Sequence, residues 1–459
     1  MYGIMVILLA LGAMIYLAYR GGSLILLAPL MAVLAVALSG TGAILAAYTQ
    51  IFMGAMGGFV IAYFPIFLLG AVFGKLAEAT GVARVLAEGI IARAGAQRAI
   101  LAVVLSAAVM TYGGVSLFVV AFAIYPIAAN LFRQAQLPKR LVPATLALGA
   151  FTFTMTALPG TPAIQNAIPM PHFGTTPYAA PGLGIVAALI MFLGGWRWLE
   201  FRARHIGPGY GAEDDVPPPD ARLDRDSGDF WLALVPFLLM IATNALFTWV
   251  IIPRLQTGYL ALPLYGATDI SALRGLWSII AALVASILAL LAMNWRRSGL
   301  AEALNAGAAG ALMPIFNTAS LVGFGAVIAA LPAFGLIRDQ VLTIGGANPL
   351  LSLAVATNLL AGITGSASGG MSIALATLGE TYRQMAAEAG IAPALLHRVA
   401  AVATGGLDAL PHNGAVITLL SICGLTHRES YGDIAVVAVL VPLLALAAII
   451  LLGTAFGSF

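Results

Sequence analysis

The stretch Thr404–Gly414, T-G-G-L-D-A-L-P-H-N-G, lies in the middle of an apolar segment that runs from about residue 399 to 424. A segment of that length can cross a bilayer, because a spanning helix needs roughly 20 residues. Pro411 lacks an amide donor and clashes with the preceding turn, so a helix is expected to break here. Hydrocarbon cannot satisfy the freed N–H and C=O groups. The break must therefore face protein or a wet cavity, together with Asp408 and His412.

The composition limits the class of protein. Mean hydropathy is +1.01, and 61% of the residues are hydrophobic while 8% are charged, which predicts an all-α polytopic membrane protein. The net charge of +3 is accounted for by basic loops and indicates no nucleic-acid partner. Cys423 is the only cysteine, which excludes an intrachain disulfide and cysteine-based metal or redox motifs. Residues 1–19 lack a basic amino-terminal region and a cleavage site, so they are interpreted as a first span.

Apolar runs define the expected spans. Two apolar blocks are interrupted by glycine-rich polar tips at 111–116 and 364–372, which predicts re-entrant hairpins at about 99–132 and 347–380. For the first block, two tilted spans are the alternative. Segments 82–96 and 335–343 are amphipathic, which favours a position along the membrane interface. Full spans are expected at about 2–19, 22–40, 53–77, 182–198, 230–251, 274–293, 303–331 and 433–453, with broken spans at 141–170 and 399–424.

Local matches at nearly constant separation relate the two halves of the chain. The first set is G-V-A-R at 81–84, G-G-V-S at 113–116 and A-L-P at 157–159; the second is G-L-I-R at 335–338, G-G-M-S at 369–372 and A-L-P at 409–411. They predict two repeats, residues 1–200 and 230–459, joined by a polar cytoplasmic linker at 201–229.

Each repeat would hold about five transmembrane helices, one of them broken at mid-membrane, and one hairpin, so the second repeat enters with inverted topology. With the amino terminus outside, most basic residues fall on the inner side, as the positive-inside rule requires. The basic residues left on the outer side are Arg254, Arg274, Arg338, Arg383 and Arg398.

Inverted repeats with discontinuous helices place a substrate site near the midplane. No lysine or arginine lies at a predicted span centre, so an anionic substrate would depend on backbone donors at half-helix N-termini. The alternative is that the small residues at the tips only permit close helix packing. The predicted substrate-binding residues are Gly113, Gly114, Ser116, Thr156, Thr161, Gln165, Asn166, Ser368, Gly369, Gly370, Ser372, His412 and Asn413.

Asp408 and His412 stand four residues apart and would share one face if the helix persisted between them. A carboxylate near an imidazole in a low-dielectric cavity can exchange a proton, so both residues are candidates for proton coupling. The alternative is a neutral, hydrogen-bonded pair that stabilises the break. Asn317 and Thr318 pack either against the site or against a neighbouring helix.

The sequence lacks recognisable catalytic, metal-binding and nucleotide-binding motifs. It contains no metal-ligand spacing, no P-loop and no recognisable nucleophile–base pair, which predicts a protein that is not an enzyme and uses no metal or cofactor.

The run L-D-A-L-P-H-N-G-A-V at 407–416, continuing to G-L-T-H-R at 424–428, resembles the gluconate permease family. The run A-L-P-G-T-P-A-I-Q-N at 157–166 is similar to that family's first-half counterpart. The resemblance covers nearly the whole chain, and the overall plan is similar to the wider ion transporter superfamily of carboxylate carriers. The chain lacks the Ser-Asn-Thr tip signatures of that superfamily's sodium-coupled dicarboxylate carriers, so the expected coupling ion is the proton rather than sodium.

The resemblance implies proton-linked uptake of a sugar acid or hydroxy acid such as gluconate, a homodimeric scaffold and elevator-type motion. It implies a multi-pass protein of the bacterial cytoplasmic (inner) membrane, whose partners are a small organic anion, a coupling ion and the lipid bilayer. Citrate or dicarboxylate carriage, sodium–proton antiport and a passive channel remain alternatives.

Overall fold

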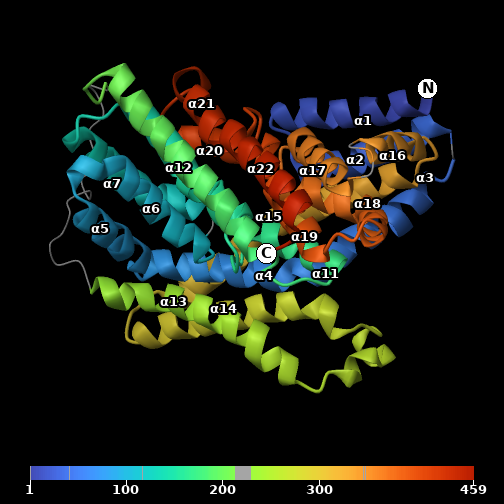
Figure 1. Ribbon diagram of the computed structural model, residues 1–459, viewed down its shortest axis with the longest axis horizontal. Coiled ribbons are helices and arrows are strands. Elements are labelled where there is room, and N and C mark those ends of the chain that lie inside the picture. The colour runs from blue at the N-terminus through green and yellow to red at the C-terminus, as the bar shows by residue number, and fades with distance from the viewer. Residues whose placement is uncertain (1, 41, 116, 212–228, 345, 347) are drawn as a thin grey trace.

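The computed structural model describes residues 2–40, 42–115, 117–211, 229–344, 346 and 348–459, and this part of the chain is helical with no strands (Figure 1). Six helices are long and apolar enough to cross a membrane, which confirms the prediction of an all-α polytopic membrane protein. They are α3–α4 (Ile44–Ala79), α12 (Pro181–Ile206), α13 with its continuation (Phe230–Arg254), α14 (Ile270–Met293), α15 (Leu300–Ala330) and α21–α22 (His427–Phe456).

The shorter helices form an amino-terminal pair, two hairpins and two interrupted segments. The pair is α1 (Tyr2–Tyr19) and α2 (Leu24–Ser39). The hairpins are α6 (Ala99–Tyr112) with α7 (Leu117–Gln134), and α17 (Pro349–Thr364) with α18 (Ala367–Glu388). The first interrupted segment contains α8 (Val142–Ala150), α9 (Phe153–Thr156), α10 (Ile164–Ala167) and α11 (Pro169–Phe173); the second contains α19 (Pro393–Ala403) and α20 (Gly414–Ile422).

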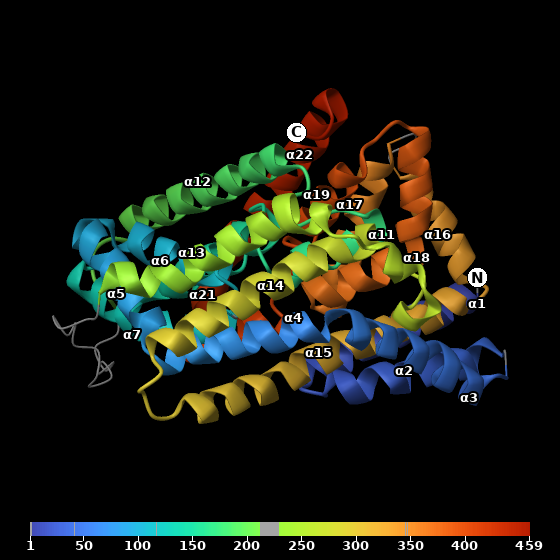
Figure 2. The same cartoon turned by 90° about the horizontal axis from the view of Figure 1, so that it is seen from below.

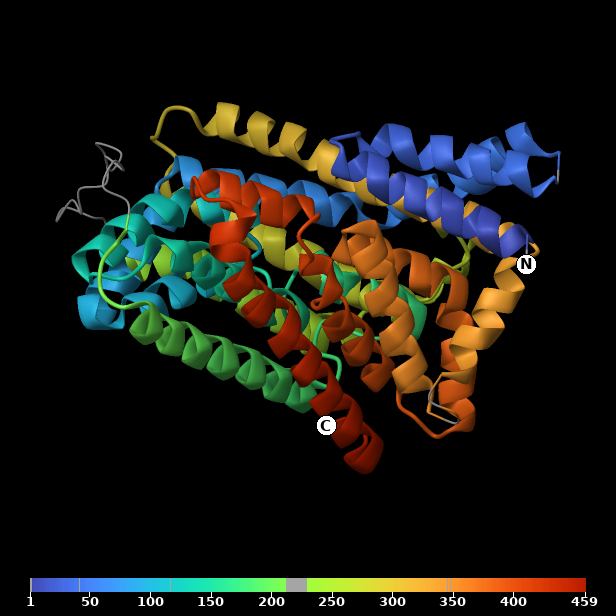
Figure 3. The ribbon, with the colours of Figure 1, turned by 90° about the horizontal axis from the view of Figure 1, so that it is seen from above.

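The hairpins lie at opposite ends of the molecule. In Figure 1, α6 and α7 occupy the left half and α17 and α18 the right half. Helices α4 and α15 run side by side along the length of the molecule (Figure 2). Their close approach requires a small residue, because a Cβ atom at Gly307 would lie 2.6 Å from the Cα atom of Val72. Helices α13 and α14 cover one face, and α12 packs beside α22 at another (Figure 3).

The order of elements recurs in the second half of the chain. A long helix (α4 or α15), a short helix (α5 or α16), a hairpin, an interrupted segment and a closing helix (α12 or α22) follow one another twice. Helix α14 packs on α4 as α2 packs on α15. This recurrence supports our proposal of two inverted repeats; the opposite membrane polarity remains a prediction.

The amphipathic segment at residues 82–96 is a helix that packs on protein along one face, and its position at the membrane interface stays a prediction. Helix α5 (Val82–Ala94) packs against α6 and α13, and it buries Val82, Leu86, Glu88 and Ile91. Glu88 is accommodated because the Arg84 Nε atom lies 2.7 Å from its carboxylate. The counterpart α16 (Phe334–Thr343) has no buried residue, which is compatible with an interfacial helix.

The predicted linker at 201–229 starts too early, because α12 continues as a helix to Ile206. Residues 212–228, most of that linker, lie outside the described residues, as does residue 347 at the predicted start of the second hairpin.

The inverted arrangement makes a prediction about accessibility. Gln97 before α6 and Glu388 at the end of α18 are both exposed, and they lie at the bases of the two hairpins. We expect Gln97→Cys and Glu388→Cys, each in a Cys423→Ser background, to react with a membrane-impermeant maleimide from opposite sides of the membrane. Labelling of both cysteines from the same side would contradict the inverted arrangement.

Candidate functional site

The second interruption, residues 404–413, is tied to the tip of the α17–α18 hairpin by Asn413. Its Nδ2 atom donates to the Gly365 carbonyl at 2.8 Å and also to the Asp408 carbonyl. Its Oδ1 atom accepts from the backbone N–H groups of Ala415 at 2.6 Å and Val416 at 3.4 Å. One side chain therefore caps α20, closes the loop before it and joins both to the hairpin tip.

His412 also binds the hairpin, rather than Asp408. Its Nε2 atom lies 2.9 Å from the Gly362 carbonyl oxygen, so this nitrogen is the donor. The helix does not persist between residues 408 and 412: a 3₁₀ turn at Leu407–Ala409 precedes Pro411. The predicted common face of Asp408 and His412 is therefore not formed.

The Asp408 side chain is half-buried, and its carboxylate lies against the backbone N–H groups of residues 408 and 409. Among the described residues, no basic side chain forms an ion pair with it. Asp408 is thus an acidic group at the interruption without a cationic counterpart.

Helix α21 (His427–Ala435) supplies further donors to the same loop. The Nε2 atom of His427 donates to the Pro411 carbonyl at 2.8 Å, and the Tyr431 hydroxyl donates to the Ala409 carbonyl at 3.2 Å. These carbonyl groups have lost their helical partners, so side chains from another element take over that function.

The first interruption, residues 157–163, follows the same principle. Its carbonyl groups accept hydrogen bonds from neutral side chains of three different elements. The bonds are Tyr112 Oη to the Pro159 carbonyl at 2.6 Å, Asn244 Nδ2 to the Gly160 carbonyl at 2.8 Å and Asn166 Nδ2 to the Thr161 carbonyl at 3.0 Å. Tyr112 is the last residue of α6, so this interruption is held to the tip of the α6–α7 hairpin.

The two interruptions meet in space. A Cβ atom at Gly405 would lie 3.1 Å from Cγ2 and 3.2 Å from Oγ1 of Thr156. Glycine at this position therefore lets the backbone of the second interruption approach the end of α9. Of the two residues in this contact, Thr156 belongs to the predicted site and Gly405 does not.

Arg398 was missed by the sequence analysis, which placed it among outer loop arginines. It lies within α19 and is fully buried, so it is not an arginine of an outer loop. Its Nε and Nη2 atoms donate to the Ala179 carbonyl at 3.1 and 2.7 Å. Its Nη1 atom reaches the Thr156 carbonyl at 3.3 Å and Oδ1 of Asn166 at 3.4 Å. The available signal was Pro393, which begins α19 earlier than the apolar run suggested.

His397, also fully buried, stands beside Arg398. Its Nε2 atom lies 3.0 Å from Oδ1 of Asn166, and its Nδ1 atom lies 2.6 Å from Oγ1 of Thr175. The predicted residue Asn166 is thus the centre of a buried network that links the first interruption to α19.

Hydroxyl groups collect at the α17–α18 tip. The Oγ atom of Ser368 lies 3.3 Å from Oγ1 of Thr318 and 3.4 Å from Oγ of Ser366. Thr318 therefore packs against α18 at the hairpin tip, and its part in the site stays a prediction. Ser372 Oγ on α18 and Gln165 Oε1 on α10 are buried without a hydrogen-bond partner, so both retain capacity for a ligand.

The glycines predicted to bind substrate lie at close helix contacts. A Cβ atom would clash with Phe237 at Gly113, with Leu321 at Gly369 and with the Ala361 backbone at Gly370, where it would lie 2.2 Å from the nitrogen. These positions support the packing alternative. Gly114 has φ of +83°, which the turn between α6 and α7 requires. Ser116 lies outside the described residues.

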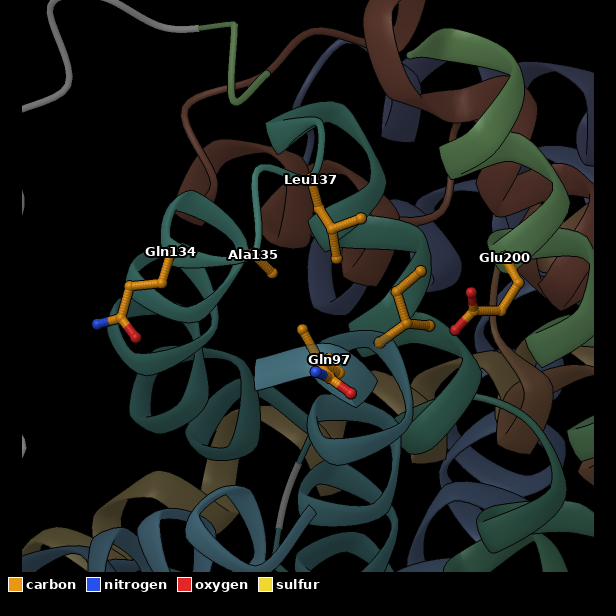
Figure 4. A pocket seen from close by; sticks show the side chains of 7 residues that line it. Gln97, Gln134, Ala135, Leu137 and Glu200 are labelled. Carbon is orange, nitrogen blue, oxygen red and sulfur yellow. The ribbon is translucent and has the colours of Figure 1, made fainter. Parts of the chain in front are cut away.

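Two further features lie outside this site. Within the described part of the chain, no group of three or more His, Cys, Asp or Glu side chains is arranged to hold a metal ion. A cavity of about 250 Å³ opens at the base of the α6–α7 hairpin, where α6 begins and α7 ends. Gln97, Gln134 and Glu200 line it (Figure 4). None of the predicted site residues lines that cavity.

Comparison with known proteins identifies the class. The chain is 48% identical over 447 residues to the uncharacterized transporter YxjC of Bacillus subtilis (strain 168), and the match covers 94% of each sequence. The chain belongs to the YxjC family of transporters. No family model matches it. The transporter prediction is confirmed at this level, and the six long apolar helices agree with a multi-pass membrane protein.

Two solved transporters share the fold of this chain. The YdaH transporter of Alcanivorax borkumensis superposes with a TM-score of 0.56 at 17% identity, over 91% of this chain and 90% of that one. MtrF of Neisseria gonorrhoeae gives a TM-score of 0.56 at 14% identity, over 91% and 85% of the two chains. At these identities the likeness shows the fold alone.

Asn413 provides a test of how the second interruption is held together. We expect Asn413→Ala to destabilise the protein by about 1–3 kcal/mol, because it removes the cap of α20 and leaves the Gly365 carbonyl without its donor. The matched control is Asn348→Ala, which removes the cap on the Leu350 N–H group and an exposed hydrogen bond to the Thr454 hydroxyl, and costs about 1 kcal/mol. Thermal melting of the purified proteins in detergent compares them; equal losses would contradict the bridging role of Asn413.

Proposed function

We propose that the protein is a secondary active transporter that couples protons to the uptake of a small hydroxylated carboxylate. Gluconate and related aldonates are the first candidates, followed by short hydroxy acids. The observation that carries the proposal is the convergence of two helix N-termini, those of α18 and α20, where Asn413 binds Gly365.

The convergence favours an anion. Helix N-termini carry partial positive charge, and α18 and α20 have 22 and 9 residues, so each provides such an end. Ser366 and Asn413 cap these ends internally and define their positions. The adjacent hydroxyls of Ser368 and Thr318 are neutral donors and acceptors that suit the hydroxyl groups of a sugar acid.

Coupling to protons is assigned to Asp408. Its carboxylate has no cationic partner among the described residues and lies in the loop that Asn413 closes. Protonation of this group would neutralise a charge at the site, so it can link proton binding to substrate binding. His412, bonded to the hairpin, is proposed to hold the tip and contact substrate rather than relay a proton.

We further propose that the protein acts as a homodimer in the bacterial cytoplasmic membrane and moves its hairpins and interrupted segments together. Citrate or dicarboxylate carriage and sodium–proton antiport are the alternatives within transporters. Export is a further alternative, since MtrF is described as illuminating a class of antimetabolite efflux pumps. Ion dependence and direction of transport separate these possibilities.

Uptake into proteoliposomes tests the proposal. With an inside-alkaline pH gradient, the wild type is expected to accumulate D-gluconate, and a sodium gradient is expected to be dispensable. Asp408→Asn should abolish gradient-driven accumulation, because the group that takes up the proton is gone, while D-gluconate counterflow is retained.

Glu380→Gln is the matched control, since this exposed carboxylate pairs with Arg383 on the surface, and it should accumulate D-gluconate like the wild type. Undiminished accumulation by Asp408→Asn would contradict the coupling role. A wild-type protein that neither transports D-gluconate nor is stabilised by any hydroxy acid in a thermal-shift screen would contradict the substrate class.

A further inference from the structure

We propose that Arg398 supplies the positive charge that recognises the carboxylate of the transported substrate. The inference rests on the proposed function and adds the residue that selects an anion over a neutral polyol.

The guanidinium of Arg398 is a buried charge with only neutral partners. It is fully buried, and its acceptors are two backbone carbonyl oxygens and one amide oxygen. Over the described ranges, no carboxylate forms an ion pair with it. A buried ion without a counter-charge is costly, so a partner of opposite charge during the transport cycle would offset that cost.

Hydrogen bonding to the interrupted backbone does not by itself require a charge. The neighbouring carbonyl groups of Pro159, Gly160 and Thr161 are satisfied by a phenol and two amides. Neutral donors therefore perform the structural task elsewhere in the same loop. The charge at Arg398 is then explained by recognition of an anion rather than by backbone satisfaction alone.

Arg398 is also placed where the moving parts meet. It binds the carbonyl of Thr156, whose side chain contacts the position of Gly405 in the second interruption. The phenol of Tyr112, at the end of α6, lies close enough for an electrostatic interaction with the guanidinium. Arg398 is therefore bonded to the end of α9, the same residue at which the second interruption meets the first.

Unused hydrogen-bonding groups belong to residues that precede two of its partners, Ala179 and Asn166, in the sequence. The hydroxyl of Tyr178 is buried without a partner and stands 3.0 Å from where a Cβ atom of Gly160 would be. Gln165 Oε1, one residue before Asn166, is likewise buried without a partner. A hydroxyl and an amide oxygen that are buried without partners have the capacity to bind a carboxylate that carries hydroxyl groups.

Ligand binding to the purified, full-length protein tests the inference, with D-gluconate and the neutral polyol D-glucitol as probes. We expect Arg398→Gln to bind D-gluconate about 10-fold to 100-fold more weakly than the wild type, since hydrogen bonds to charged groups are the stronger ones. Arg398→Lys, which keeps the charge, should recover part of that loss. Affinity for D-glucitol should stay unchanged.

Arg274→Gln is the matched control, because Arg274 also donates its Nε and Nη2 atoms to one backbone carbonyl, that of Thr248. It should leave the affinity for D-gluconate unchanged. A loss in Arg274→Gln equal to that in Arg398→Gln would show a general structural effect and overturn the inference.

A second variant decides the matter if Arg398→Gln fails to fold. Asn166→Asp places a carboxylate beside the guanidinium and should weaken D-gluconate binding by supplying an internal counter-charge. Asn244→Asp removes an amide donor from α13 to the same loop, at Gly160, and should not weaken D-gluconate binding. Wild-type affinity in Asn166→Asp would overturn the inference. A wild type that binds no hydroxy acid would instead overturn the proposed function and, with it, this inference.

Discussion

Backbone groups that have lost their helical partners at two interruptions determine much of the structure of this membrane protein. Water cannot reach such groups in hydrocarbon, so each needs a partner from the protein. At the second interruption, Asn413, His427 and Tyr431 supply donors to carbonyl groups of that loop. The partners come from elements distant in sequence, so two short non-helical loops fix how hairpins and long helices sit together.

The carbonyl groups of the two interruptions accept hydrogen bonds from different sets of elements, and we assign the two loops different tasks. The first is held by α6, α10, α13 and α19, and Arg398 and His397 bind around it from the second half of the chain. The second is bonded to its own hairpin and to α21, and it contains the unpaired Asp408. We infer that Arg398 at the first interruption and the helix N-termini beside the second hold the anion between them, and that the second interruption also carries the proton. Their contact at Thr156 and Gly405 would let one respond to the other.

Local chemistry was sufficient to predict the interruptions and the hairpin turns. Pro159 and Pro411 cannot continue a helix, and polar glycine-rich tips cannot remain helical in hydrocarbon. The role of Arg398 could not be predicted, because its burial follows from how α19 packs against a loop of the other half. The helical spacing predicted that His412 shares a face with Asp408. In the structure His412 instead hydrogen-bonds to the carbonyl of Gly362, which is distant in sequence and could not be predicted from local spacing. For α5, the amphipathic pattern predicted one apolar face, whereas its partners α6 and α13 follow from the tertiary fold.

The contact between the two interruptions is the central claim, and a disulfide cross-link tests it directly. Thr156→Cys and Gly405→Cys would be combined in a Cys423→Ser background, with a protease site inserted in the polar segment between α12 and α13. Because a Cβ atom at Gly405 lies 3.1 Å from the Thr156 side chain, oxidation should join the two halves, which then migrate together after proteolysis and separate on reduction. Halves that separate after oxidation, as they do in either single-cysteine protein, would contradict the account.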